Sequence, residues 1–178
     1  MGVPSVIEDV MIDQNSFAAM LAIISSLRDT RTRPAVLATV ETTGRDGRRS
    51  VAKALVNFND RIWSLTEENV EYAFHPETGW TISSDGEAET VPRERDDWMP
   101  EGMLLFFPLS LRIWGGKMDD WRVTAAEMTE GEVHLSFRHK EDTDFCGQAT
   151  IDLQWGIATE FTTPWERTTL QAIKSSWG

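Results

Sequence analysis

Cysteine is nearly absent from this sequence, because Cys146 is the only one in 178 residues. A single thiol excludes an internal disulfide, and it excludes zinc modules whose ligands are several cysteines. Acidic neighbours such as Asp144 disfavour the thiolate that a nucleophile needs. We therefore expect Cys146 to be a small packed residue without a chemical role.

Basic residues are also scarce, with 17 Lys and Arg against 29 Asp and Glu, so the net charge is −12 at pH 7. Such a surface repels phosphate backbones and anionic membranes, and no strongly basic stretch offsets it. The composition therefore predicts no nucleic-acid partner. It leaves room for a basic protein partner, because complementary charge speeds association.

The sequence has no apolar run long enough for a helix that spans a bilayer, which needs about 20 residues. The candidate near the start, Phe17–Leu27, is short, contains Ser25 and Ser26 and is followed by Arg28. Residues Met1–Asp13 carry three acidic side chains and no basic one, unlike a secretory signal. These features predict no integral membrane segment. They predict a cytoplasmic protein, or an exported one if the sequence is a processed mature form.

Motifs for catalysis are absent as well. No serine stands in a G-x-S-x-G turn, and neither a P-loop nor a dinucleotide fingerprint occurs. His134 and His139 fall on opposite faces of one strand, so they cannot hold a metal ion together. The acidic cluster of Glu141, Asp142 and Asp144 lacks the glycine and the ligand spacing of a calcium loop. We therefore predict no enzyme activity, no catalytic residue, no cofactor and no metal site.

What the sequence does contain begins with one amphipathic helix, predicted at Ser16–Leu27. Apolar residues recur there at helical spacing, so one face of the helix is expected to pack on something larger. That face consists of Phe17, Met20, Leu21, Ile24 and Leu27.

Two groups of short strands follow the helix. In each group, β-branched and aromatic residues alternate with polar ones, and turn residues separate the segments. The first group is predicted at Ala35–Thr43, Arg48–Phe58, Arg61–Thr66, Val70–Phe74, Trp80–Ser83 and Ala88–Val91. The second is predicted at Trp121–Met128, Glu132–His139, Cys146–Gln154 and Ile157–Thr162, while the tail Trp165–Trp177 fits either a last strand or a short helix.

The most apolar stretch, Met103–Trp114, separates the two groups of strands. Pro108 interrupts it, which favours broken helical pieces over a central strand. Left exposed it would invite aggregation, so we expect it to cover an apolar cavity as a lid, with freedom to move at Gly102, Gly115 and Gly116. The candidate ligand-binding residues are Trp98, Met103, Leu104, Phe106, Phe107, Leu109, Leu111 and Trp114.

This order of elements predicts a mainly β (α+β) fold. A consecutive series of about 9–11 antiparallel strands curls, because each strand twists relative to the next. The N-terminal helix and the proline-broken segment both need burial, and the concave face of a strongly curved sheet or half-barrel provides it. No repeat and no long linker divides the chain, so residues 1–178 are predicted to form a single half-barrel domain.

Three local features accompany this order. His75–Trp80 is a turn between two middle strands, Leu104–Leu109 follows the first group of strands, and Asp144–Thr150 contains a D-x-x-G turn into a late strand. Over approximately Phe17–Thr162 the chain resembles the bacterial lipoprotein-carrier superfamily, the LolA/LolB-like half-barrels. The resemblance implies that Leu104–Leu109 stands in the place of that family's lid. It also implies a role in carrying apolar cargo, and that family is exported.

Two functions fit these observations. The first is a non-enzymatic binding or carrier protein that holds an apolar ligand, such as an acyl chain, a lipid or a lipoprotein-like segment, in the concave face. The alternative is an acidic protein-interaction module, such as an inhibitor or immunity-type protein, that binds a basic protein partner. Native mass spectrometry separates them, because the first predicts a co-purified lipid and the second a basic protein.

Overall fold

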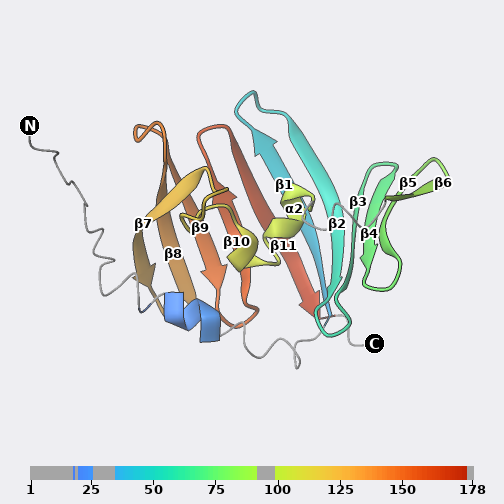
Figure 1. Cartoon of the computed structure of the whole chain (residues 1–178), viewed down its shortest axis with the longest axis horizontal. Helices are drawn as coiled ribbons and strands as arrows, with labels where there is room; N and C mark the ends of the chain where they lie inside the picture. Colours follow the sequence, from blue (N-terminus) through green and yellow to red (C-terminus); the bar gives the residue numbers. More distant parts are fainter. Residues whose placement is uncertain (1–17, 19, 26–34, 92–98, 176–178) are drawn as a thin grey trace, which may run out of the picture.

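A curved antiparallel sheet dominates the computed structural model, which describes residues 18, 20–25, 35–91 and 99–175. Within these residues eleven strands follow the order β6-β5-β4-β3-β2-β1-β11-β10-β9-β8-β7. The sheet does not close, because β6 and β7 lie at its opposite edges (Figure 1). The mainly β half-barrel predicted from the sequence is therefore confirmed.

The strand bounds agree with the predicted ones to within two residues at each end. The first six strands are β1 (Val36–Gly44), β2 (Arg49–Asn57), β3 (Ile62–Glu67), β4 (Val70–His75), β5 (Gly79–Ser84) and β6 (Glu87–Val91). The other five are β7 (Trp121–Met128), β8 (Glu132–His139), β9 (Cys146–Asp152), β10 (Ile157–Thr162) and β11 (Glu166–Ser175). The tail thus forms a strand, the first of the two alternatives.

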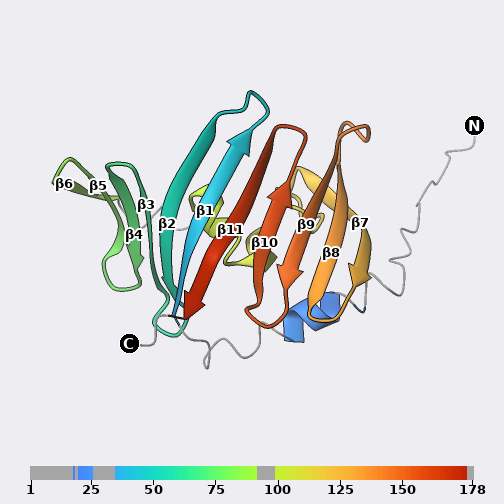
Figure 2. The ribbon, with the colours of Figure 1, turned by 180° about the vertical axis from the view of Figure 1, so that it is seen from behind.

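Strand β11, although it comes last in the chain, lies in the middle of the sheet. It pairs with β10 on one side and with β1 on the other, where Val40 lies opposite Leu170. Two meanders, β1–β6 and β7–β11, are therefore joined by their first and last strands (Figure 2). This arrangement leaves β6 and β7 far apart.

The chain that connects β6 to β7 has to cross the whole sheet. Residues 99–114, here called the crossing segment, lie over its concave face (Figure 1). They contain a short helix, α2 (Glu101–Leu104), and a 3-10 turn, η3 (Pro108–Ser110). Pro108 begins η3, where the absence of its N–H costs nothing, because the first N–H groups of a helix have no partner in the helix. The proline-broken helical segment predicted on the concave face is therefore present.

The core lies between the concave face and the crossing segment. On the sheet side it follows the alternation of the strands, and its residues include Val36, Ala38, Val40, Ala52, Ala54, Val56, Val133, Leu135 and Phe137. The crossing segment contributes five side chains that are at most 3% exposed: Met103, Leu105, Phe106, Leu111 and Ile113. The segment is thus a second layer of the core.

The N-terminal helix is seen in its described part, where residue 18 and residues 20–25 are helical and lie near β7–β9 (Figure 1). Ile23 is fully buried, whereas Leu21 and Ile24 are 47% and 37% exposed. The predicted apolar face is therefore wrong at Leu21 and Ile24, whereas Phe17 and Leu27 lie outside the described residues. Consecutive residues on a helix differ by about 100° in direction, so a run of apolar residues cannot fix which side packs.

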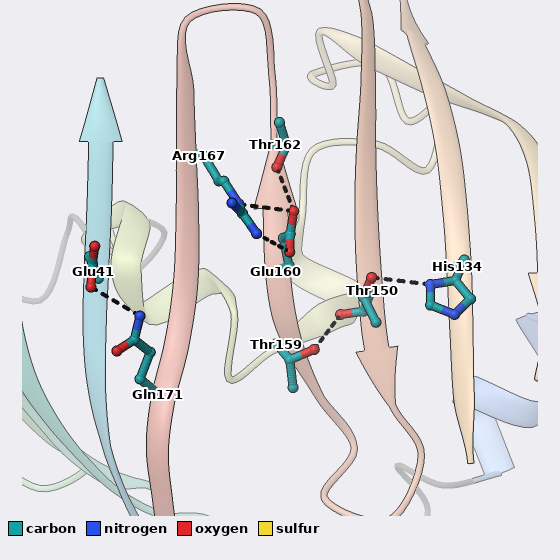
Figure 3. Close-up of polar contacts among 8 residues, drawn as sticks. All are labelled: Glu41, His134, Thr150, Thr159, Glu160, Thr162, Arg167 and Gln171. Atoms are coloured by element: carbon teal, nitrogen blue, oxygen red, sulfur yellow. Dashed lines mark hydrogen bonds and ion pairs between the residues drawn. The ribbon is translucent and has the colours of Figure 1, made fainter. Parts of the chain in front are cut away.

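The opposite face of the sheet is polar across β8–β11 (Figure 3). Arg167 donates hydrogen bonds to both carboxylate oxygens of Glu160, from Nε at 3.1 Å and from Nη2 at 2.9 Å. His134 Nδ1 lies 3.2 Å from Thr150 Oγ1. These groups bond to one another on this face, whereas the apolar pocket described below lies on the concave face.

Two glutamates near the β10–β11 turn are expected to affect stability in opposite directions. Burial, reinforced by the charge of Glu101, raises the pKa of Glu166, while the hydrogen bonds from Arg167 lower the pKa of Glu160. A raised native pKa means that the ionised form destabilises the fold. This penalty disappears as the pH falls below the pKa of the same group in the unfolded state. A lowered native pKa means that the ionised form stabilises the fold at any pH above the pKa of the unfolded state. This stabilisation is lost as the pH falls through the pKa of the native state.

Glu166→Gln is therefore expected to raise Tm at pH 7, and Glu160→Gln to lower it. Both differences from wild type should shrink toward about pH 3, below the ordinary glutamate pKa. Thermal melts of the three proteins between pH 3 and pH 8 measure this. A lower Tm for Glu166→Gln at pH 7 would contradict the assigned cause.

Candidate functional site

A cavity of about 450 Å³ lies between the crossing segment and the strands β2–β4. Its sheet side is formed by Phe58, Trp63 and Phe74. Its other side is formed by the crossing segment, through Met99, Phe106, Phe107, Pro108, Leu109 and Ser110. Asn57 and Arg61, on either side of the β2–β3 turn, complete it. The walls are mostly apolar, and the volume falls within the range of about 300–1,000 Å³ typical of small-molecule sites.

The sheet side of the cavity is backed by a cluster of three aromatic rings. Strand register places Trp63 opposite Phe74, and Phe74 opposite Trp80, so all three lie on the concave face. Trp63 and Trp80 are buried and meet edge to face, with ring centroids 4.6 Å apart. Edge-to-face rings add to the stability that burial provides, so this wall is well packed.

On the other side of the cavity, the exposed fraction of the side chains increases from Phe106 to Leu109. Phe106 is 1% exposed and belongs to the core, and Phe107 is half-buried. The Phe107 ring meets the edge of Phe58, with centroids 5.9 Å apart. Leu109 is 52% exposed and lies at the mouth.

The crossing segment is hydrogen-bonded to the sheet on both sides of this wall. The Leu105 carbonyl accepts from the Ala158 N–H at 2.7 Å, and the Ile113 carbonyl accepts from the Val123 N–H at 2.8 Å. Residues 107–110 lie between these two anchors. This short turn, with Leu109 at its tip, borders the cavity. No backbone hydrogen bond joins it to the described part of the sheet.

Gly102 has a different role from the predicted one. A Cβ at this position would lie 2.9 Å from Cγ1 of Val40, so the glycine lets α2 approach β1 closely. It is a packing residue, and the freedom of movement expected there is corrected. Gly115 has a φ of 85°, a conformation that favours glycine, and it turns the chain toward β7.

The predicted ligand-binding residues divide into those that line the cavity and those that do not. Three of the eight line it: Phe106, Phe107 and Leu109. Four others belong to the core or pack against it: Met103, Leu104, Leu111 and Trp114. Trp98 lies outside the described residues.

The sequence reasoning missed the sheet side of the cavity and its mouth. Phe58, Trp63 and Phe74 had a signal, because each falls on the apolar face of its predicted strand. Arg61 had none, because nothing local distinguishes a turn arginine beside a cavity from one in solvent.

Cys146 is exposed, so the expected packed thiol is wrong. The alternation of β9 explains it, because Gly147, Ala149 and Ile151 point into the core and their neighbours point out. Among the described residues, no three His, Cys, Asp or Glu side chains are grouped so that they could hold a metal ion. In the same part of the chain, no helix has the length and apolarity needed to cross a membrane.

Comparison with known proteins shows a likeness of fold alone. No family model and no curated protein matches the sequence. A chain of the MucA/MucB complex from Pseudomonas aeruginosa is similar, with a TM-score of 0.52 and 15% identity over 89% of this chain and 56% of that one. This chain thus spans little more than half the length of that relative.

Two further solved structures are more distant. An uncharacterized conserved protein from Thermus thermophilus has a TM-score of 0.44 and 10% identity, over 89% of this chain and 88% of that one. A LolA superfamily protein from Nitrosomonas europaea has a TM-score of 0.24 and 8% identity, over 86% and 92%. The half-barrel predicted from the order of elements is therefore similar in fold to the chain of the MucA/MucB complex.

Proposed function

We propose that this protein is a non-enzymatic binding or carrier protein for an apolar ligand, such as an acyl chain, a lipid or a lipoprotein-like segment. The observation that carries the proposal is the cavity of about 450 Å³ between Phe58, Trp63 and Phe74 on the sheet and the crossing segment. The pocket is open to solvent at its mouth and mostly apolar inside, as small-molecule sites commonly are. Transfer of an apolar chain from water into it is favourable. The resemblance of the order of elements to the LolA/LolB-like half-barrels implies the same function.

The turn at residues 107–110 is proposed to admit the ligand. It borders the cavity, and the hydrogen bonds at Leu105 and Ile113 hold the chain on either side of it. Opening would displace Phe107 and Leu109. It would also break the hydrogen bond from Trp114 Nε1 to the carbonyl of Pro108, the buried residue of this turn, while Met103, Leu105 and Phe106 stay in the core.

Phe107→Ala tests the proposal. The folded wild type is expected to bind an environment-sensitive fatty-acid probe saturably, and the variant to bind it about tenfold more weakly, because a ring that lines the cavity is lost. The free energy of unfolding should fall by less than about 3 kcal/mol, since Phe107 is only half-buried. Probe fluorescence titration and urea unfolding measure the two effects.

Phe145→Ala is the matched control, because it removes a partly exposed ring that does not line the cavity. It should leave probe binding unchanged. If the folded wild type shows no saturable probe binding, the proposed function is wrong and the crossing segment is ordinary core.

A second candidate is an acidic module that binds a basic protein partner. Two observations favour it: the net charge of −12, and the likeness of fold to a chain from a protein–protein complex. On the face opposite the crossing segment, Leu37 and Leu55 lie across from each other and are exposed, which provides apolar contact area for a partner. Native mass spectrometry of the purified protein separates the candidates, since co-purified lipid supports the first and a basic protein the second.

A further inference from the structure

The mouth of the cavity carries a positive charge. Among the lining residues that the structure describes, Arg61 is the one charged residue, although Asp and Glu outnumber Lys and Arg by 29 to 17 in the chain. A surface of such composition would more often place a carboxylate there. A lining that contains a guanidinium and, in the part of the chain that the structure describes, no carboxylate is suited to a negative group.

The β2–β3 turn holds the carboxylate of Asp60, the residue that precedes Arg61, in a hydrogen bond. Asn57 accepts hydrogen bonds from the backbone N–H groups of Asn59 and Asp60, at 3.1 and 3.2 Å, and donates from Nδ2 to the Asp60 carboxylate at 2.7 Å. The ion pairs found in the described part of the chain do not include Arg61. Its exposed guanidinium therefore remains available at the mouth.

We propose that Arg61 binds the anionic headgroup of a single-chain amphiphile whose acyl chain occupies the cavity. This inference rests on the proposed function and narrows it to ligands that end in a carboxylate or a phosphate. The chain would lie against Phe106 and Phe107, and the charged end would stay at the mouth, because burying an unpaired charge is costly. A guanidinium fork matches the oxygens of either headgroup in two parallel hydrogen bonds. It also offsets the repulsion that a chain of net charge −12 exerts on an anion.

Ligands that differ only in their headgroup test this inference. Decanoate, decyl phosphate and 1-decanol compete with Nile red, a neutral probe, for the wild-type cavity. We expect the wild type to prefer at least one of the two anions over the alcohol by about five- to tenfold, as a charge-assisted hydrogen bond at a partly solvated site provides. The anion with the larger preference identifies the headgroup, and added salt should reduce the preference.

Arg61→Gln is expected to remove the preference, because it should weaken the binding of the two anions far more than the binding of 1-decanol. Arg61→Gly is a second variant, because the φ of 56° at this position suits glycine and the turn is expected to form. Arg48→Gln is the matched control, since Arg48 loses the same charge in the β1–β2 turn, where its side chain is 92% exposed.

Two failures can be told apart. If wild type binds Nile red and 1-decanol but prefers neither anion, or if Arg61→Gln and Arg61→Gly keep the preference, the role of Arg61 is overturned while apolar binding stands. If the folded wild type binds neither Nile red nor 1-decanol, the proposed function fails, and the inference fails with it.

Discussion

Gly147→Ala is expected to lower the free energy of unfolding by about 3 kcal/mol, although it adds a single methyl group. A Cβ at Gly147 would lie 2.2 Å from Cε2 of Phe137 and 2.6 Å from the backbone oxygen of Thr162. The Phe137 ring has no free direction, because it is fully buried, stacks on Phe161 and meets Trp121 edge to face. The Thr162 carbonyl belongs to β10, which pairs with β9, so relief would require the two strands to separate.

Thermal unfolding measures this effect as a fall in Tm of roughly 6–12 °C for a chain of this size. Gly44→Ala is the control. A Cβ at Gly44 would lie 3.0 Å from Oδ1 of the Asp46 side chain, and the next nearest atom, the backbone oxygen of Arg48, is 3.8 Å away. That exposed side chain can move, so the control should cost less than about 1 kcal/mol. An unchanged Tm for Gly147→Ala would show that β9 and β10 do not pack on Phe137 as described.

Phe106→Ala is expected to cost about 3–5 kcal/mol, because the ring is 1% exposed and its removal leaves a void beside an existing cavity. Phe107→Ala should cost less, since Phe107 is half-buried, and Leu109→Ala should cost little, since Leu109 is 52% exposed. Urea unfolding of the three variants, with an unchanged m-value, measures this order.

The order matters because it separates the fixed part of the crossing segment from the turn at the mouth. If Phe106→Ala costs no more than Phe107→Ala, the crossing segment is not a layer of the core. The cavity would then lose its defined wall.

Most of the fold could be predicted from the sequence, because each strand carries its own signal. In β2, for example, Ala52, Ala54 and Val56 are buried and their neighbours are not, as the alternation predicts. Strand β11 was ambiguous for a physical reason. Its side chains are largely polar on both faces, and what makes it a strand is pairing with β1 and β10, which no local pattern reveals.

Only one of the two walls of the candidate site could be predicted from the sequence. The apolar run containing Phe106, Phe107 and Leu109 identified one wall, because a long apolar stretch has to be covered by something. The facing wall depends on where the crossing segment passes over the sheet, and that path is set by the edge positions of β6 and β7. The position of Arg61 beside the crossing segment also depends on this path, so it could not be predicted from the sequence around Arg61.

The pairing of β1 with β11 has a consequence for biosynthesis. Glu41 and Gln171, which are joined by a hydrogen bond across this pair, are 130 residues apart in the chain. At about 5–20 residues per second, the ribosome makes β1 several seconds before its central partner exists. During that interval the first meander can form, but one side of β1 has unpaired backbone groups, which attract other chains. β1 is therefore an edge strand in the nascent chain and a central strand in the finished protein, so its protection depends on the last strand to be synthesised.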